Sequence, residues 1–170
     1  TYRARLFLVG SMNPEEGRLR PQMQDRFGLR VVVKALEDPA ERLEAYRRSV
    51  AYQQVPHKML AEWREETNQA GLDIQQARAL LPDVTFAPGA EETGLRWVQT
   101  LQIESHRAEI TMFEAARAYA AADGRDTATV DDLRVVAPMA LRQRQSEFIA
   151  DYVAQQSAGD QIIQEIIGQD

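Results

Sequence analysis

The chain contains 170 residues, of which 44% are apolar and 27% charged, and its formal net charge is −6. This length and composition suit a soluble globular protein of one or two small domains with a real hydrophobic core. The lack of cysteine excludes disulfides, thiolate metal sites and cysteine nucleophiles, and no run approaches the ~18 apolar residues of a membrane span. Thr1 leads almost at once into an apolar run with no start methionine or signal peptide, so we expect a piece of a longer, cytoplasmic protein.

The charge is unevenly spread along the chain. Residues 1–34 carry three acidic side chains against seven basic ones, Arg3, Arg5, Arg18, Arg20, Arg26, Arg30 and Lys34, a net +4, so the other 136 residues carry −10. The acidic body argues against nucleic-acid binding. The basic segment suits phosphate or an acidic neighbouring subunit; the alternative is a set of solvated arginines around an ordinary strand edge.

Two apolar runs near the start predict strands that are covered on both faces, as in a parallel sheet: Leu6–Val9 and Leu29–Val33. Asn13 follows the first run, at the edge where open α/β sheets bind ligands. Its amide offers a donor and an acceptor that can hold an attacking water against a phosphate. The alternative is an asparagine that only forms an Asx turn.

A short helix is predicted between these runs. Arg20 and Pro21 mark its start, and Gly28 is expected to end it as a left-handed cap. Phe27 is expected to pack inward, which leaves Arg26 at a helix end close to the sheet edge. The alternative for this region is a surface ion pair between Asp25 and other arginines.

Three further helices are predicted before residue 83. Asp38 and Pro39 begin one that runs to about residue 53, a second follows Pro56, and a third covers 71–81. Leu60, Leu72, Ile74, Leu80 and Leu81 fall at helical spacing, and the aromatic and methionine positions of these helices, Tyr46, Met59 and Trp63, are expected to lie in a core.

The segment 86–89 is the clearest linker, and the chain after it is expected to be helical. Helices are predicted over 90–103 and 106–122, the second capped by Ser105 and directing Ile110 and Phe113 into a core. Gly124 ends that helix. The next helix begins at a capping box of Thr129 and Asp132, and Pro138 should split or kink it.

Arg107 lies in the first turn of the 106–122 helix. Free N–H groups and the helix dipole favour an anion there, and a guanidinium adds a forked charged donor that suits phosphate. The alternative is a simple exposed arginine. His57 and His106 have no histidine or cysteine partner at ligand spacing, so a metal site is not expected.

Three blocks of sequence resemble the AAA+ ATPases of the magnesium chelatase type. SMNPEEGRLRPQMQDRFGLRV resembles their sensor-1 and arginine-finger region, PHKMLAEWREETNQAGLDIQQARALLPDV their connecting helices, and SHRAEITMFEAARAYAAADGRDTATVDDLRVVAPMALRQR their helical lid. The resemblance covers roughly residues 3–144. It implies a mostly α fold: the C-terminal part of an α/β AAA+ core with two parallel strands and a short helix (1–55), connecting helices (56–88), and an all-α lid bundle (89–170).

The resemblance also implies roles for single residues. Asn13 would position the attacking water, Arg26 would be the arginine finger that reaches the ATP site of the neighbouring subunit, and Arg107 would be sensor 2. Arg20 is a second candidate for the contact in trans. The parent protein would use ATP and Mg²⁺ and form a ring, expected to be a hexamer, that drives Mg²⁺ insertion into protoporphyrin IX together with other chelatase subunits.

The phosphate-binding loop of such ATPases is missing from this stretch. A P-loop needs Gly-x-x-x-x-Gly-Lys-Ser/Thr, whereas the only two lysines, Lys34 and Lys58, follow valine and histidine. No apolar strand ends in an Asp-Glu pair that could hold Mg²⁺. We therefore expect this polypeptide alone to bind no nucleotide cofactor and to be inactive, and its first partner to be its own N-terminal P-loop half.

Two other functions remain open from the sequence. One is a MoxR-type remodelling ATPase that matures another protein; the closeness of the 56–82 match favours the chelatase. The other is a nucleotide-free helical interaction module, in which Asn13 and Arg107 would lie far apart. The tail, 146–170, departs from the family pattern, and its apolar stripes are expected to need a partner surface.

Overall fold

The computed structural model describes residues 7–13, 15, 17, 19–142 and 144. The expectations for Leu6, for Pro14 and for the tail fall outside this range. The described part is mostly helical, as predicted, with the helices α1 (Pro21–Gln24), α2 (Pro39–Gln54), α3 (Pro56–Glu62), α4 (Arg64–Leu80), α5 (Ala90–Thr100), α6 (Arg107–Ala122) and α7 (Val130–Leu141), the 3₁₀ turn η2 (Leu81–Asp83), and the strands β1 (Thr85–Phe86) and β2 (Thr127–Ala128). No helix among them combines the length and the apolar composition that crossing a membrane requires.

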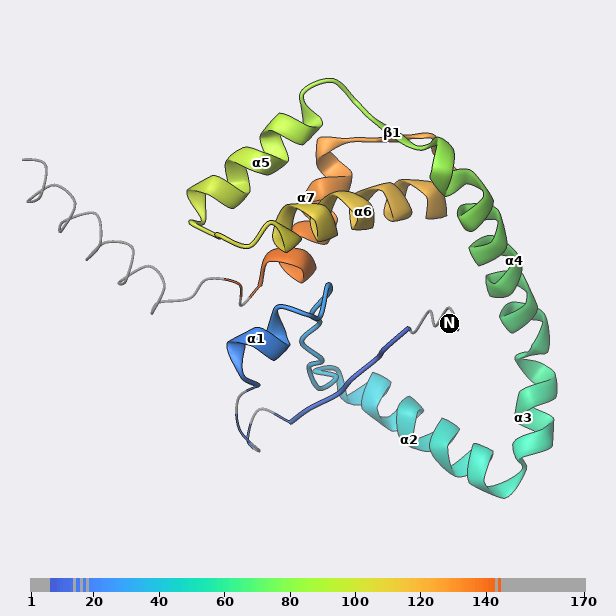
Figure 1. Cartoon of the computed structure of the whole chain (residues 1–170). Coiled ribbons are helices and arrows are strands. Elements are labelled where there is room, and N and C mark those ends of the chain that lie inside the picture. Colours follow the sequence, from blue (N-terminus) through green and yellow to red (C-terminus); the bar gives the residue numbers. More distant parts are fainter. Residues whose placement is uncertain (1–6, 14, 16, 18, 143, 145–170) are drawn as a thin grey trace, which may run out of the picture.

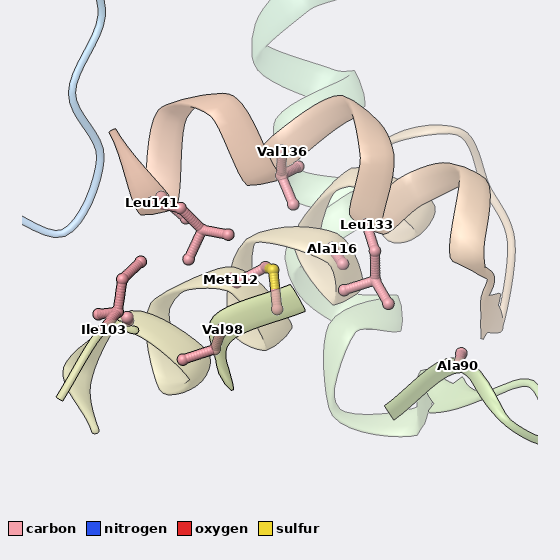
Figure 2. Packing of buried hydrophobic residues seen from close by; sticks show 10 residues of the cluster. Ala90, Val98, Ile103, Met112, Ala116, Leu133, Val136 and Leu141 are labelled. Atoms are coloured by element: carbon pink, nitrogen blue, oxygen red, sulfur yellow. The ribbon is translucent and has the colours of Figure 1, made fainter. Parts of the chain in front are cut away.

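The hydrophobic core lies between α5, α6 and α7. Met112 of α6 and Leu133 of α7 are its largest fully buried side chains, and Figure 2 shows Leu133 and Val136 projecting from α7 toward the side on which Met112 lies. Alanines at buried α6 positions let α4 and α7 approach closely. A Cβ at Gly94 would lie 2.7 Å from the ring of Phe113, so α5 can pack against α6 only because this residue is glycine.

A two-residue parallel ladder closes this bundle. Thr85 pairs with Thr127 and Phe86 with Ala128, so the segment that enters the lid lies beside the α6–α7 connection. Phe86 also packs edge-to-face on Phe113 of α6, with ring centroids 5.5 Å apart. The predicted linker at 86–89 therefore begins inside the domain that it was expected to precede.

Arg117 of α6 holds the end of α4 against the lid. Its Nε donates to the carbonyl of Val84 and its Nη2 to that of Leu81, both at 3.0 Å. The two carbonyls lie at and just after the end of a helical segment, where few backbone donors remain; that of Leu81 also accepts the N–H of Val84 at 3.3 Å.

We expect Arg117→Met to lower the free energy of unfolding by about 1–3 kcal/mol, because hydrogen bonds from a charged donor to two carbonyls are lost. Chemical denaturation followed by circular dichroism measures the change. Arg134→Met on the exposed face of α7 is the matched control, because Arg134 pairs only with the exposed Asp131. Equal losses in the two variants would show that the contacts of Arg117 contribute nothing.

The predicted capping box at the start of α7 is confirmed. Asp132 accepts hydrogen bonds from the backbone N–H and the hydroxyl of Thr129, at 2.7 and 3.0 Å. Its carboxylate is buried and also receives both Nη groups of Arg125, at 2.8 and 2.5 Å. Gly124 ends α6 as predicted, with a φ of 71°, which brings Arg125 round to this pair.

This pair predicts a loss of stability in acid. The hydrogen bonds from Arg125 first, and those from Thr129, lower the pKa of Asp132 from 3.8 to about 2, against the opposing effect of burial. Because the folded-state pKa is depressed, the stabilisation is complete above about pH 4 and disappears as the pH falls through about 2. We expect about 2 kcal/mol to be lost over this window in urea titrations of the wild type. Asp132→Asn should be less stable at neutral pH and lack this component of the acid dependence; an unchanged acid limb would contradict the assignment.

The expected core in the connecting helices is wrong for most of their length, although Leu80 and Leu81 at the end of α4 pack against the buried cluster of Val84, Ala120, Ala121 and Ala128. Among the described residues, α2, α3 and α4 bury no side chain, and Leu60, Trp63, Leu72 and Ile74 are all exposed. Figure 1 shows the physical reason, because the three helices follow one another in an arc and meet neighbours mainly at their ends. The structure also runs α4 straight through the start predicted at Gly71.

The two apolar runs at the start also differ from the prediction. Residues 7–9 and 29–33 form no strand, and Phe7 and Val33 are 94% and 90% exposed. A buried parallel strand needs a neighbouring strand and helices on both faces, and the described residues supply neither. The mostly helical fold is confirmed, while its two parallel strands are β1 and β2 rather than these runs.

Two smaller predictions were wrong, and a third was wrong in part. Gly28 is not among the glycines with positive φ, and Pro138 does not split α7, although the alternative of a kink stays a prediction. Ile110 is 59% exposed instead of lying in the core, because it faces the surface hollow described below.

Candidate functional site

A shallow hollow of about 310 Å³ lies between the loop that follows α1 and the first turns of α6. Its lining is formed by Asp25, Arg26 and Gly28 from the loop and by Arg107, Ile110 and Thr111 from α6. Two predicted site residues, Arg26 and Arg107, are thus brought together although 81 positions separate them. With one carboxylate and two guanidinium groups, the lining carries a net positive charge that favours an anion.

The first turn of α6 is open toward this hollow. No side chain caps the helix, because Ser105, the predicted cap, instead donates its hydroxyl to Asp25 Oδ1 at 2.9 Å. The N–H of Ala108 donates to the carbonyl of Ser105 at 2.9 Å, and the dipole of α6 adds to the positive charge of Arg107 at this end of the helix. Glu109 is held away by His106, whose Nδ1 lies 2.7 Å from its carboxylate.

Asp25 joins the hollow to the lid through three partners. Arg144 Nη1 lies 2.6 Å from Oδ1, Ser105 binds the same oxygen, and Arg107 Nη1 lies 3.4 Å from Oδ2. The contact with Arg107 is the longest, and the Arg107 side chain is 59% exposed. Such an exposed pair contributes at most about 1 kcal/mol, so Arg107 can leave it for an incoming anion while Arg144 keeps Asp25 neutralised.

Two arginines cross between the loop and the end of α7. Arg144 donates from Nη2 to the carbonyls of Phe27 and Gly28, at 3.2 and 3.1 Å, and from Nε to that of Ala140, at 2.6 Å. In the opposite direction, Arg30 donates its backbone N–H to the carbonyl of Met139 at 2.9 Å and its Nη1 to the carbonyl of Arg142 at 2.7 Å. We call Arg30, Arg144 and the groups that they bind the arginine seam.

The electrostatics of the seam follow from its burial. Desolvation lowers the pKa of Arg30, the neighbouring Arg144 lowers it further, and Asp25 acts in the opposite direction. Nε of Arg30 is buried without a hydrogen-bond partner in the described structure. Arg30 remains charged at neutral pH because a guanidinium titrates far above it.

Close packing, rather than a left-handed turn, explains the glycine at position 28. A Cβ there would lie 3.3 Å from Cγ2 of Thr111 on α6. A side chain there would require Thr111 to shift by a few tenths of an ångström, so the absence of a Cβ at Gly28 favours the close approach of the loop to α6.

Asn13 and Arg20 do not line the hollow. Asn13 is exposed and its Oδ1 accepts the backbone N–H of Glu15 at 3.2 Å, which is the Asx turn considered as its alternative. Arg20 is exposed, and its carbonyl accepts the N–H groups of Met23 and Gln24 at the start of α1. The catalytic role of Asn13 and the trans contact of Arg20 stay predictions.

Sequence reasoning missed Arg144 and Ser105 as parts of this site. Arg144 binds Asp25 across 119 positions, and no motif or helical spacing links the two. The only available signal was the expectation that Asp25 pairs with other arginines, which the contacts with Arg107 and Arg144 now specify. In the described residues, no three histidine or carboxylate side chains gather to hold a metal ion.

Comparisons with known proteins agree with this architecture. Residues 98–166 match the AAA lid domain family. The magnesium-chelatase subunit ChlI homolog of Methanocaldococcus jannaschii is 39% identical over 141 residues, which cover 83% of this chain and 39% of that protein. The magnesium-chelatase 38 kDa subunit of Rhodobacter capsulatus is 41% identical, and the ChlI subunit of Synechocystis 36% identical, each over 83% of this chain and 40% of the relative.

The chain thus spans about two fifths of the length of these relatives. The resemblance seen in the sequence is confirmed, and it favours the chelatase over the remodelling ATPase and the interaction module. Residues 98–166 of the chain thus match the AAA lid domain, and 83% of its length is similar to part of the magnesium-chelatase ChlI and 38 kDa subunits.

Proposed function

We propose that the chain is the lid-bearing part of an AAA+ motor subunit of magnesium chelatase, which couples ATP hydrolysis to Mg²⁺ insertion into protoporphyrin IX. The observation that carries this proposal is the hollow that holds Arg26 and Arg107 side by side at the open start of α6. The names of the relatives support the assignment to a magnesium chelatase, because all three are magnesium-chelatase subunits or a homolog of one.

The hollow suits the terminal phosphate of ATP. Two exposed guanidinium groups and a helix N-terminus can share the charge that develops on the transferred phosphoryl group. Because Arg26 and Arg107 line one hollow in one chain, both can approach the same phosphate from the same side. Nothing in the described residues suits Mg²⁺, so the metal of Mg-ATP would be held by the rest of the nucleotide site.

The remaining parts of the site would come from other segments. The P-loop belongs to an N-terminal half of the subunit, because neither Lys34 nor Lys58 lies in such a motif. The arginine finger would complete the site of the next subunit in a hexameric, cytoplasmic ring, with Arg20 as an auxiliary contact. Asn13 would orient the attacking water once its strand is paired in the complete core, and the other chelatase subunits would hold the porphyrin.

The proposal is tested with the protein encoded by the complete reading frame. We expect it to hydrolyse ATP and, with its companion chelatase subunits, to insert Mg²⁺ into protoporphyrin IX. The change in porphyrin fluorescence measures the insertion. Residues 1–170 alone should hydrolyse none. Hydrolysis without insertion would favour a remodelling ATPase, no hydrolysis would favour an interaction module, and turnover by residues 1–170 that Asn13→Ala abolishes would contradict the division of the site.

A further inference from the structure

Arg144 occupies an unusual place for a charged side chain. Its side chain is 1% exposed, and its three nitrogens reach four acceptors: Asp25 Oδ1 and the carbonyls of Phe27, Gly28 and Ala140. One acceptor belongs to the last turn of α7, and the other three belong to the loop after α1. A buried guanidinium with this fork of partners fixes two segments relative to each other in a way that a lysine cannot reproduce.

The residue enclosed by these contacts is Arg26. Its neighbours on both sides, Asp25 and Phe27, are bound to Arg144, and its own N–H donates to the carbonyl of Met23 at 3.1 Å. The backbone around Arg26 is therefore held while its side chain stays exposed at the hollow. No described contact of Arg144 is made to the guanidinium of Arg26 itself.

The partners of Arg30 strengthen the same connection. Arg30 binds Met139 and Arg142 at the end of α7 and, through Nη2, the carbonyl of Gln24 at the end of α1. The loop and α7 thus exchange hydrogen bonds in both directions. The described structure shows no comparable set of contacts between this loop and α2, α3 or α4.

We propose that Arg144 is a positioning residue for Arg26. It fastens the loop after α1, which carries Arg26, to the lid, so that Arg26 and Arg107 meet the phosphate as one rigid unit. This inference rests on the proposed function, because Arg144 can affect ATP hydrolysis in this way only if Arg26 acts as the arginine finger. Arg26 then moves with α6 and α7 of its own chain and not with the arc of connecting helices. Any rotation of the lid changes the distance between Arg26 and the neighbouring nucleotide.

The test uses the intact ATPase with Arg144→Gln and Arg144→Lys. We expect Arg144→Gln to lower kcat about 100-fold, the size of effect that a displacement of about 1 Å can have, and to leave the KM for ATP unchanged. Arg144→Lys keeps the charge but lacks the forked donors of the guanidinium, so its kcat should lie between that of the wild type and that of Arg144→Gln. Arg142→Gln is the matched control, because its exposed side chain can change while its carbonyl still accepts from Arg30.

A double mutant separates positioning from a general structural role. If Arg144 acts through Arg26, then Arg26→Ala combined with Arg144→Gln is no slower than Arg26→Ala alone. Multiplied losses, or an Arg144→Gln enzyme with wild-type kcat, would overturn the inference. If Arg144→Gln does not fold, Arg144→Lys answers the same question in the same cycle.

Different results contradict the proposed function and the role of Arg144. An intact protein whose ATP hydrolysis is indifferent to Arg26→Ala contradicts the proposed function. A protein that depends on Arg26 but is indifferent to both Arg144 variants contradicts only the role of Arg144. Thermal unfolding of every variant shows whether a loss of kcat is accompanied by a loss of the fold.

Discussion

Replacement of Arg26 by alanine in the intact subunit is expected to lower kcat for ATP hydrolysis by about 10³–10⁵-fold, the range found when an arginine finger is removed from related phosphoryl transfers. The reason is electrostatic, because the guanidinium stabilises charge that develops only in the transition state. Affinity for ATP should change little, since the P-loop supplies most of the ground-state binding. Phosphate release measures kcat, and equilibrium binding of a fluorescent nucleotide measures the affinity.

Arg47→Ala provides the matched control for this experiment, because it removes an exposed arginine from α2, away from the hollow. Mixed rings add a second reading. If the finger acts in trans, Arg26→Ala subunits should lower the turnover of wild-type neighbours, whereas a contact within one chain would leave those neighbours unaffected. A decrease in kcat of less than about tenfold in rings made only of Arg26→Ala subunits would contradict a contact of Arg26 with the transition state.

Truncation of Leu133 to alanine is expected to cost about 2–5 kcal/mol of stability. Leu133 is fully buried and lies with Met112 at the centre of the α5–α7 core (Figure 2). The variant loses the transfer free energy of the side chain and leaves a cavity that the alanine-lined interface between α6 and α7 cannot fill. The midpoint of thermal unfolding should fall by at least about 8 °C in a domain of this size.

Val135→Ala on the same helix is the matched control, because Val135 is 47% exposed. We expect its midpoint to shift by a small fraction of that of Leu133→Ala. Equal shifts in the two variants would contradict the assignment of Leu133 to the buried face of α7 and of Val135 to its exposed face. Scanning calorimetry of both variants beside the wild type gives the comparison directly.

The parts of the fold that sequence reasoning predicted correctly are governed by local chemistry. The start of α2 follows from Asp38, whose carboxylate accepts the N–H of Ala40 at 2.9 Å, and the end of α6 follows from Gly124. The capping box of Thr129 and Asp132 is another local signal. In each case the residues that decide the structure lie within four positions of one another.

The parts that were predicted wrongly depend on what packs against them. Leu72 and Ile74 have the helical spacing of a core face, but α4 offers this face to no described neighbour. The run 29–33 has the composition of a buried strand, yet burial needs adjoining strands that no local pattern can supply. Periodicity reports that a surface is apolar and leaves open what covers it.

The candidate site shows the same division. Arg26 and Arg107 were singled out from their own surroundings, a helix end and a helix start, and the structure places both at one hollow. Arg144 carries no such local mark, because its role arises only when the end of α7 meets the loop at Asp25 (Figure 1). Tertiary contact thus adds the residue that the motifs could not indicate.

The central claim is that the hollow between Arg26 and Arg107 receives the terminal phosphate of ATP. The most direct measurement is a structure of the intact ring with a non-hydrolysable ATP analogue. The account predicts both guanidinium groups within hydrogen-bond distance of the same γ-phosphate, that of the adjacent subunit, with Arg144 still bound to Asp25. A γ-phosphate that neither arginine touches, in its own subunit or in the neighbouring one, would contradict the claim.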